Sequence, residues 1–259
     1  MNQIVMPKFS IIIPTYEHTE LLQRALQSVM MQNYADWEVI ISDDSKSNDV
    51  KSYIEGLQDK RINYLKHQKG ETAAENWNYG IQAAKGDYII LMHHDEAFKE
   101  TVHLQLIAKA FESGVHIVIT NIEIDKYGRI SAGKPLWLKK FALSMPSLLF
   151  LCNTIGPTAC IAFRRERMQV IDDRLRWLVD AEWYFRLLKG NKILFLENLS
   201  ILSYHGHKGQ LSLSLNSLEA FKADQVIINE TYRKEIVVKC MTVLYGWLII
   251  RTKEMLGKI

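Results

Sequence analysis

The N-terminal part of the chain alternates short apolar runs with stretches of helical spacing. Apolar runs typical of buried strands lie at Phe9–Ile13, Trp37–Ser42, Ile62–Leu65 and Tyr88–Met92. Apolar residues at helical spacing lie between them, at Leu21–Met31, Val50–Leu57 and Thr72–Ala84. Alternating strands and helices with short connections predict an α/β fold with a mostly parallel central sheet and flanking helices on both faces.

The second part of the chain has a more mixed pattern. Helical spacing lies at Thr101–Ser113, at Asp180–Lys189 and from Leu218 to the end. Strand patterns lie at His116–Ile124, Ala159–Phe163, Ile193–Leu196 and Ile201–His205. We therefore expect one domain over residues 1–215 and a helical C-terminal extension over residues 216–259.

Polar clusters follow three of the predicted strands, at Thr15–Glu17, Asp43–Ser45 and His93–Glu96. The carboxyl ends of parallel strands share one edge of a sheet, and ligands bind outside that edge. The three clusters are therefore expected to converge on one site.

The cluster His93-His94-Asp95-Glu96 directly follows the apolar run Ile89–Met92. Carboxylates suit Mg²⁺ or Mn²⁺, and imidazole is acceptable to Mn²⁺. A divalent cation at such an edge most often holds phosphate. The alternative is a polar loop without a ligand.

Composition sets outer bounds on these interpretations. The chain has 259 residues, and its charged content of 24% and hydrophobic content of 48% are those of a globular protein. The net charge of +3 gives no argument for nucleic acid. The spacing of Cys152, Cys160 and Cys240 matches neither a zinc site nor a disulfide framework. The sequence shows neither a signal peptide nor an apolar run long enough to span a bilayer. We therefore expect a cytoplasmic protein.

The ordered motifs over about residues 8–212 resemble the family 2 glycosyltransferases, which have a GT-A-type (Rossmann-like) fold. The resemblance is carried by five segments: Phe9–Tyr16, Trp37–Ser45, Asn76–Ile90, Thr158–Arg164 and Trp177–Trp183. It implies transfer of a sugar from a nucleotide donor, usually with inversion. It further implies a nucleotide-binding half over about residues 8–96 and an acceptor-binding half over about residues 97–215.

The resemblance also assigns roles to individual residues. The nucleotide site would comprise Pro14, Thr15, Tyr16, Glu17, Asp43, Asp44, Asn76, His93 and His94. Asp95 matches the last aspartate of the family's Asp-x-Asp metal motif, which implies Mn²⁺ or Mg²⁺ as cofactor. Asp180 matches the acidic residue that acts as general base.

Two positions depart from the family pattern. His93 replaces the first aspartate of the metal motif, so it is either a second metal ligand, a contact to ribose and phosphate, or a structural residue. Glu75 replaces an arginine that commonly precedes the helix asparagine. Thr72 and Glu75 have the spacing of a capping box, which would give this change a local cause.

Proton transfer from the acceptor requires a carboxylate, and Asp180 is our first choice with Glu182 in reserve. Two residues apart on a helix, they point in different directions, so only one is expected to be the base. The alternative for Asp180 is a helix cap, which is compatible with catalysis.

Further candidates are histidines and tryptophans. In the segment His205–Gln210, His207 is a candidate metal ligand and Lys208 a candidate phosphate contact, unless the segment is only a surface loop. Trp177, Trp183 and Trp137 are candidates to stack on acceptor sugars, and we expect two of the three to be core residues.

The segment Ile236–Ile250 is almost continuously apolar, with Arg233 and Lys234 before it and Arg251 after it. Three interpretations remain open: peripheral contact with an anionic membrane, packing on the domain, or a homodimer interface.

The sequence therefore predicts an inverting, metal-dependent glycosyltransferase that uses a UDP-sugar. Its acceptor would be a glycan or lipid-linked glycan in the assembly of surface polysaccharide such as capsule or lipopolysaccharide. The first alternative is a non-catalytic nucleotide-sugar-binding protein. The second is a sugar-phosphate nucleotidyltransferase, although Pro14–His18 lacks the glycine-rich, basic loop of that class.

Overall fold

A computed structural model describes residues 8–67, 70, 72–207, 210 and 216–255. Its centre is a 9-stranded sheet with the order β3-β2-β1-β4-β8-β6-β9-β5, with β7 paired to β6. The strands are β1 (Phe9–Thr15), β2 (Trp37–Asp43), β3 (Ile62–Lys66), β4 (Tyr88–Leu91), β5 (Glu96–Phe98), β6 (Ile117–Lys126), β7 (Arg129–Ala132), β8 (Ile161–Arg164) and β9 (Ile193–His205).

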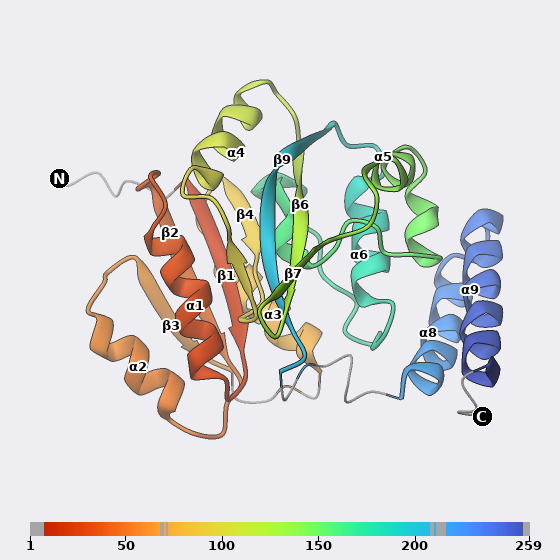
Figure 1. The fold of residues 1–259 in the computed structure, drawn as a ribbon, viewed down its shortest axis with the longest axis horizontal. Helices are drawn as coiled ribbons and strands as arrows, with labels where there is room; N and C mark the ends of the chain where they lie inside the picture. The colour runs from red at the N-terminus through yellow and green to blue at the C-terminus, as the bar shows by residue number, and fades with distance from the viewer. Residues whose placement is uncertain (1–7, 68–69, 71, 208–209, 211–215, 256–259) are drawn as a thin grey trace.

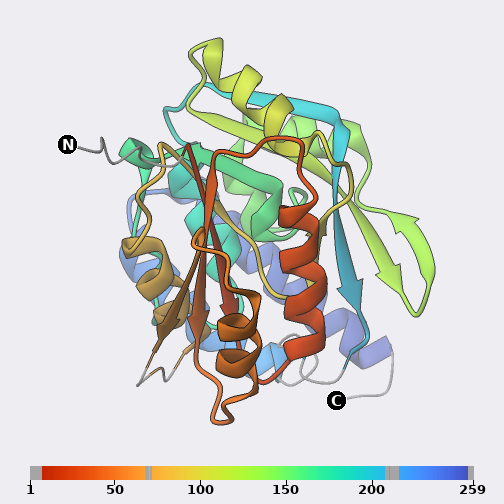
Figure 2. The same cartoon turned by 90° about the vertical axis from the view of Figure 1, so that its left-hand side faces the viewer.

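The helices connect and cover these strands. The α-helices are α1 (Thr19–Met30), α2 (Asp49–Leu57), α3 (Ala73–Gln82), α4 (His103–Glu112), α5 (Leu136–Ser144), α6 (Val179–Leu188), α8 (Ser217–Thr231) and α9 (Ile236–Met255). Three short 3₁₀ helices are η1 (Pro146–Phe150), η2 (Thr158–Cys160) and η3 (Arg165–Arg167). Figure 2 shows the N-terminal strands between α1 on one face and α3 on the other.

The N-terminal half has the expected parallel arrangement. Strands β3, β2, β1 and β4 are mutually parallel. The apolar runs of β1, β2 and β4 lie in the buried core, and the half-buried β3 packs against it. The register places Thr15 beside Asp43 and Ile12 beside Leu91, so β1, β2 and β4 end at the same edge. The predicted convergence of the three polar clusters is therefore confirmed.

The C-terminal half of the sheet is mixed. Strand β8 is antiparallel to β4 and β6, and β5 is antiparallel to β9, whereas β6 and β9 are parallel. The expectation of a mostly parallel sheet thus holds for the N-terminal half alone. The two strands expected at Ile193–Leu196 and Ile201–His205 form one strand, β9, with an irregularity opposite Thr120/Asn121.

The described residues 216–255 form helices α8 and α9, which lie at the opposite end of the molecule from α2 and β3 (Figure 1). Helix α9 packs against α8 and η1. None of the helices among the described residues has the length and hydropathy needed to span a membrane.

Candidate active site

A pocket of about 1160 Å³ lies at the edge where β1, β2 and β4 end, and α6 and the end of β9 complete its walls. Most of the predicted site residues meet there. They are Pro14, Thr15, Tyr16, Asp44, Asn76, His93, His94, Asp95, Trp177, Asp180 and His207.

Asp43 and Glu17 do not line the pocket, which corrects their expected contact with the nucleotide. The buried Asp43 side chain accepts hydrogen bonds from Ser45 N (2.8 Å) and Tyr64 Oη (2.7 Å), so it fixes the turn after β2. Glu17 has a φ of 58° and its Oε1 accepts a hydrogen bond from Lys46 N at 2.6 Å. Both carboxylates hold the loops that shape the pocket.

Asp44, the next residue after Asp43, faces the pocket. Its Oδ1 lies 2.7 Å from His67 Nδ1, and the His67 ring packs on Tyr79 with centroids 4.8 Å apart. A Cβ at Gly70 would lie 2.6 Å from Asp44 Oδ2, so a side chain at this position would displace the Asp44 carboxylate. His67 was missed in the sequence, although its position just after the strand Ile62–Leu65 was the signal that could have identified it.

The N-terminus of α3 forms another wall. Thr72 Oγ1 accepts a hydrogen bond from Glu75 N (3.2 Å), and Glu75 Oε2 accepts one from Thr72 N (3.3 Å). The capping box is confirmed, and it gives the glutamate at this position a local role. Asn76 donates through Nδ2 to Ser42 O (3.0 Å) and ties α3 to β2.

Glu96 begins β5 and holds His93 in place. The two carboxylate oxygens lie 3.0 Å from His93 Nδ1 and 3.1 Å from His93 N, and the second also accepts from Ala159 N (3.2 Å). Burial lowers the pKa of His93, but the charge and hydrogen bond of Glu96, together with the charges of Asp95 and Asp180, outweigh burial and raise that pKa to about 9. Glu96 belongs to the predicted polar cluster, but no separate role was predicted for it.

Ligand atoms of His93, Asp95 and Glu96 lie within 4.8 Å of one another. Two carboxylates and an imidazole form a donor set that fits Mn²⁺, and the carboxylates also fit Mg²⁺. His207 is not in this group of described residues, but its Nε2 lies 3.0 Å from Asp95 Oδ2. Burial opposes ionisation of Asp95, but its hydrogen bond with His207 helps to lower the pKa of the carboxyl.

Three histidine rings gather beside Asp95. The centroid of His18 lies 5.5 Å from that of His94 and 5.7 Å from that of His207. Burial lowers the pKa of His94 to about 4, so its ring is neutral near pH 7. His18 precedes α1 and was missed because it lies just beyond the predicted polar cluster. Lys208, the candidate phosphate contact, lies outside the described residues.

Asp180 is in the first turn of α6, one residue after the helix begins, and makes no capping hydrogen bond. Its Oδ1 is shielded from solvent and, within the part of the chain that the structure describes, has no hydrogen-bond partner. Thr15 Oγ1 in the same pocket is likewise shielded from solvent and without a hydrogen-bond partner among the described residues. Burial raises the pKa of the Asp180 carboxyl, with a smaller opposing effect from His93.

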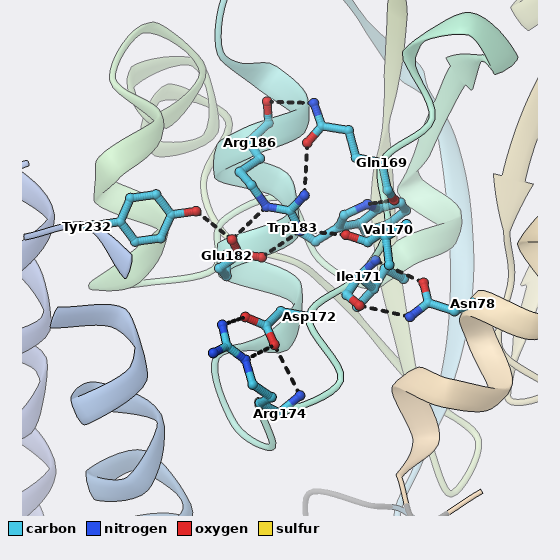
Figure 3. A network of polar contacts seen from close by, with 10 residues as sticks. All are labelled: Asn78, Gln169, Val170, Ile171, Asp172, Arg174, Glu182, Trp183, Arg186 and Tyr232. Carbon is cyan, nitrogen blue, oxygen red and sulfur yellow. Dashed lines mark hydrogen bonds and ion pairs between the residues drawn. The ribbon is translucent and has the colours of Figure 1, made fainter. Parts of the chain in front are cut away.

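Glu182 and Trp183 are not among the residues that line the pocket, which corrects their expected roles as reserve base and acceptor platform. Figure 3 shows the Glu182 carboxylate directed at Arg186 and Tyr232. Glu182 forms an ion pair with Arg186 at 2.6 Å and accepts a hydrogen bond from Tyr232 Oη at 2.5 Å. Trp183 is buried and donates through Nε1 to Gln169 O at 3.1 Å.

The three tryptophans thus have three different environments. Trp183 is a core residue, Trp137 is 69% exposed on α5, and Trp177 lines the pocket. The expectation that two of the three are core residues is met fully by Trp183 and in part by Trp177, which is half-buried and packs against the core. Trp177 donates through Nε1 to Tyr245 Oη at 2.9 Å.

Comparisons with known proteins agree with this geometry. The model of the family described as "Glycosyl transferase family 2" matches residues 10–171. A relative from Campylobacter jejuni, a GalNAc(5)-diNAcBac-PP-undecaprenol beta-1,3-glucosyltransferase, is 36% identical over 129 residues, which are 49% of this chain and 41% of that protein. The chain therefore spans less than half the length of this relative.

Solved structures share the fold. Staphylococcus aureus TarS residues 1–349 with UDP-GlcNAc superposes with a TM-score of 0.68 and 15% identity, over 86% of this chain and 66% of that one. The Pyrobaculum calidifontis mannosyltransferase PcManGT with GDP-Man and Mn²⁺ superposes with a TM-score of 0.67 and 13% identity, over 95% of this chain and 70% of that one. At these identities the likeness concerns the fold alone, and it confirms the expected GT-A-type fold. The match over residues 10–171 covers more than half of the sequence, and the chain belongs to glycosyl transferase family 2.

Proposed function

We propose that the chain transfers a sugar from a UDP-sugar donor to a glycan or lipid-linked acceptor, with inversion at the anomeric carbon. The observation that carries the proposal is the content of one pocket. The His93–Glu96 cluster and Asp180, whose shielded Oδ1 has no partner among the described residues, line the same cavity. Phosphate binding and proton acceptance are the two tasks that glycosyl transfer requires of a protein.

The donor side is formed by the ends of β1, β2 and β4. We assign Asp44 and Tyr16 to contacts with the base and ribose, and their position in the pocket beyond β2 and β1 supports this assignment. Asn76 and His94 are assigned to the same side of the pocket. Asn76 is held by a hydrogen bond to Ser42 O, and His94 Nδ1 lies close to Pro14 O. The family resemblance supports this assignment, which also names Pro14 and Thr15.

The diphosphate is assigned to the His93–Glu96 cluster. Asp95 and Glu96 would hold Mn²⁺ or Mg²⁺ with His93. When bound, the cation would neutralise the charge that develops on the leaving diphosphate. His207 orients Asp95 through the 3.0 Å contact and approaches the same region from β9. We assign His207 to this supporting role or to the ligand set itself.

Asp180 is assigned as the general base. The acceptor hydroxyl oxygen forms a bond to the anomeric carbon while the bond from that carbon to the diphosphate breaks. The hydroxyl proton passes to an Asp180 oxygen. Trp177 lies three residues before Asp180 and is proposed to contact the acceptor sugar.

We propose a lipid-linked glycan of surface polysaccharide assembly as the acceptor, at the cytoplasmic face of the membrane. The support is the C. jejuni relative, which is named for a glycan on PP-undecaprenol. Helix α9 supports membrane contact, because Ile236, Val243 and Trp247 are exposed on it. Exposed Arg233 and Arg251 near its two ends favour an anionic lipid surface over a second copy of the same basic helix.

Calorimetric titration tests the donor assignment. The panel is UDP, TDP and GDP, each with Mn²⁺ and again with a chelator. We expect UDP to bind with Mn²⁺ and to lose most of its affinity with the chelator. Tighter binding of GDP would replace the UDP assignment, and UDP binding unchanged by chelator would contradict the role of the His93–Glu96 cluster. Absence of binding by every nucleotide would contradict the proposed function.

A further inference from the structure

The segment Arg176–Asp180, which leads into the first turn of α6, carries two residues of the proposed acceptor side, Trp177 and Asp180. Leu178 occupies the N-cap position of α6, and its side chain cannot accept a hydrogen bond from the helix. The backbone N–H groups of the residues that lead into this helix, Arg176, Trp177 and Leu178, therefore need an acceptor from another part of the chain.

Asp224 on α8 supplies that acceptor. Its side chain is fully buried, and its two oxygens accept hydrogen bonds from three successive backbone N–H groups. The distances are 3.0 Å from Arg176 N to Oδ1, and 2.7 Å from both Trp177 N and Leu178 N to Oδ2. A buried carboxylate at a helix N-terminus is also favoured by the helix dipole.

Helix α9 holds the same segment by a side chain. Trp177 Nε1 donates to Tyr245 Oη at 2.9 Å, and the Tyr245 ring packs edge-on against Phe221 of α8 at 5.1 Å. A Cβ on Gly246 would lie 2.9 Å from Phe221 Cε1, so glycine at this position permits the close approach of α9 to α8. The two helices therefore hold the segment by its backbone and by its indole.

We infer that Asp224 and Tyr245 are positioning residues for the Arg176–Asp180 segment, and that α8 and α9 form part of the active site. They act through Trp177 and Asp180 and touch no reacting atom. The expected effect on turnover rests on the proposed function, whereas the hold of Asp224 and Tyr245 on the segment does not. It joins residues 216–255 functionally to the preceding domain.

The test compares wild type with Asp224→Asn and Tyr245→Phe, and uses Glu219→Gln, an exposed carboxylate on the same helix, as the matched control. Hydrogen–deuterium exchange of the amides of residues 176–178 reports whether Asp224 still accepts their hydrogen bonds. Release of UDP from UDP-GlcNAc and UDP-glucose with Mn²⁺, with water as the acceptor, reports turnover. Tyr245→Phe loses one hydroxyl and keeps the protein testable if Asp224→Asn does not fold.

We expect Asp224→Asn to accelerate exchange at residues 176–178 and to lower kcat by about 10-fold or more at unchanged KM for the donor. Tyr245→Phe should lower kcat less, and Glu219→Gln should match wild type in both measurements. Unchanged exchange in Asp224→Asn, or faster exchange with unchanged kcat, would overturn the inference. If wild type turns over no UDP-sugar, that result counts against the proposed function, and exchange at residues 176–178 alone decides whether Asp224 holds the segment.

Discussion

Asp180 and Glu182 lie two residues apart on α6 and have opposite environments. Asp180 lines the pocket with one shielded oxygen that has no partner among the described residues. Glu182 does not line the pocket and is paired with Arg186 and Tyr232 (Figure 3). One acid is thus available for chemistry, and the other joins α6 to the segment that follows α8.

Replacement of Glu182 should therefore affect stability and not turnover. Glu182→Gln leaves the Arg186 guanidinium without its ionic partner, and we expect a loss of about 1.5–3 kcal/mol in the free energy of unfolding. Chemical denaturation measures this loss, and kcat of the folded variant should match wild type. A variant of wild-type stability with strongly reduced kcat would return Glu182 to the list of catalytic candidates.

The rate should fall as the pH is lowered. A base must be ionised, and burial raises the pKa of Asp180 above its usual 3.8. Activity is therefore present above the raised pKa and is lost as pH falls through it. We expect an acid limb in the pH profile of kcat with a midpoint above that value. The same limb in the residual activity of Asp180→Asn would show that another group titrates.

Asp95 and His207 should differ in their effect on cation-dependent binding. Asp95→Asn removes a carboxylate of the His93–Glu96 cluster, whereas His207→Gln removes a side chain that contacts Asp95. We expect Mn²⁺-dependent UDP affinity to be abolished in the first variant and to fall by about 10–100-fold in the second. Equal loss in both variants would place His207 among the direct ligands.

Helix α9 should bind anionic vesicles through its exposed face. The combined change Leu244→Ser and Trp247→Ser removes apolar area from that face, and Val226→Ser, 68% exposed on α8, is the matched control. We expect the first variant to lose sedimentation with phosphatidylglycerol vesicles and the control to retain it, with binding weakened by salt. If wild type does not bind the vesicles and forms a dimer that the double variant disrupts, the exposed face of α9 is a homodimer interface.

The sequence was most informative where one physical signal dominates. Continuous apolar runs located β1, β2 and β4, and the Thr72–Glu75 spacing located the start of α3. Helix α5 was not predicted, because its residues are largely apolar yet Trp137 is exposed. Strand β5 was missed because three residues beginning with Glu96 carry no periodic signal.

Within the site, the sequence predicted which segments converge but not which side chains turn inward. Consecutive Asp43 and Asp44 were indistinguishable, and their difference arises from Tyr64 on the neighbouring strand. The orientation of Trp177 depends on Tyr245, which lies 68 residues away in the chain. Such contacts are set by tertiary packing, which local patterns do not encode.

The central claim is that Asp180 accepts the proton of the acceptor in a glycosyl transfer. The most direct test measures UDP release from a UDP-sugar by wild type and by Asp180→Asn, with UDP binding measured on the same preparations. We predict that Asp180→Asn lowers kcat by about 10²–10⁴-fold while the Kd for UDP with Mn²⁺ stays unchanged. Equal turnover by the two proteins would contradict the base assignment, and donor binding without turnover by wild type would indicate a non-catalytic nucleotide-sugar-binding protein.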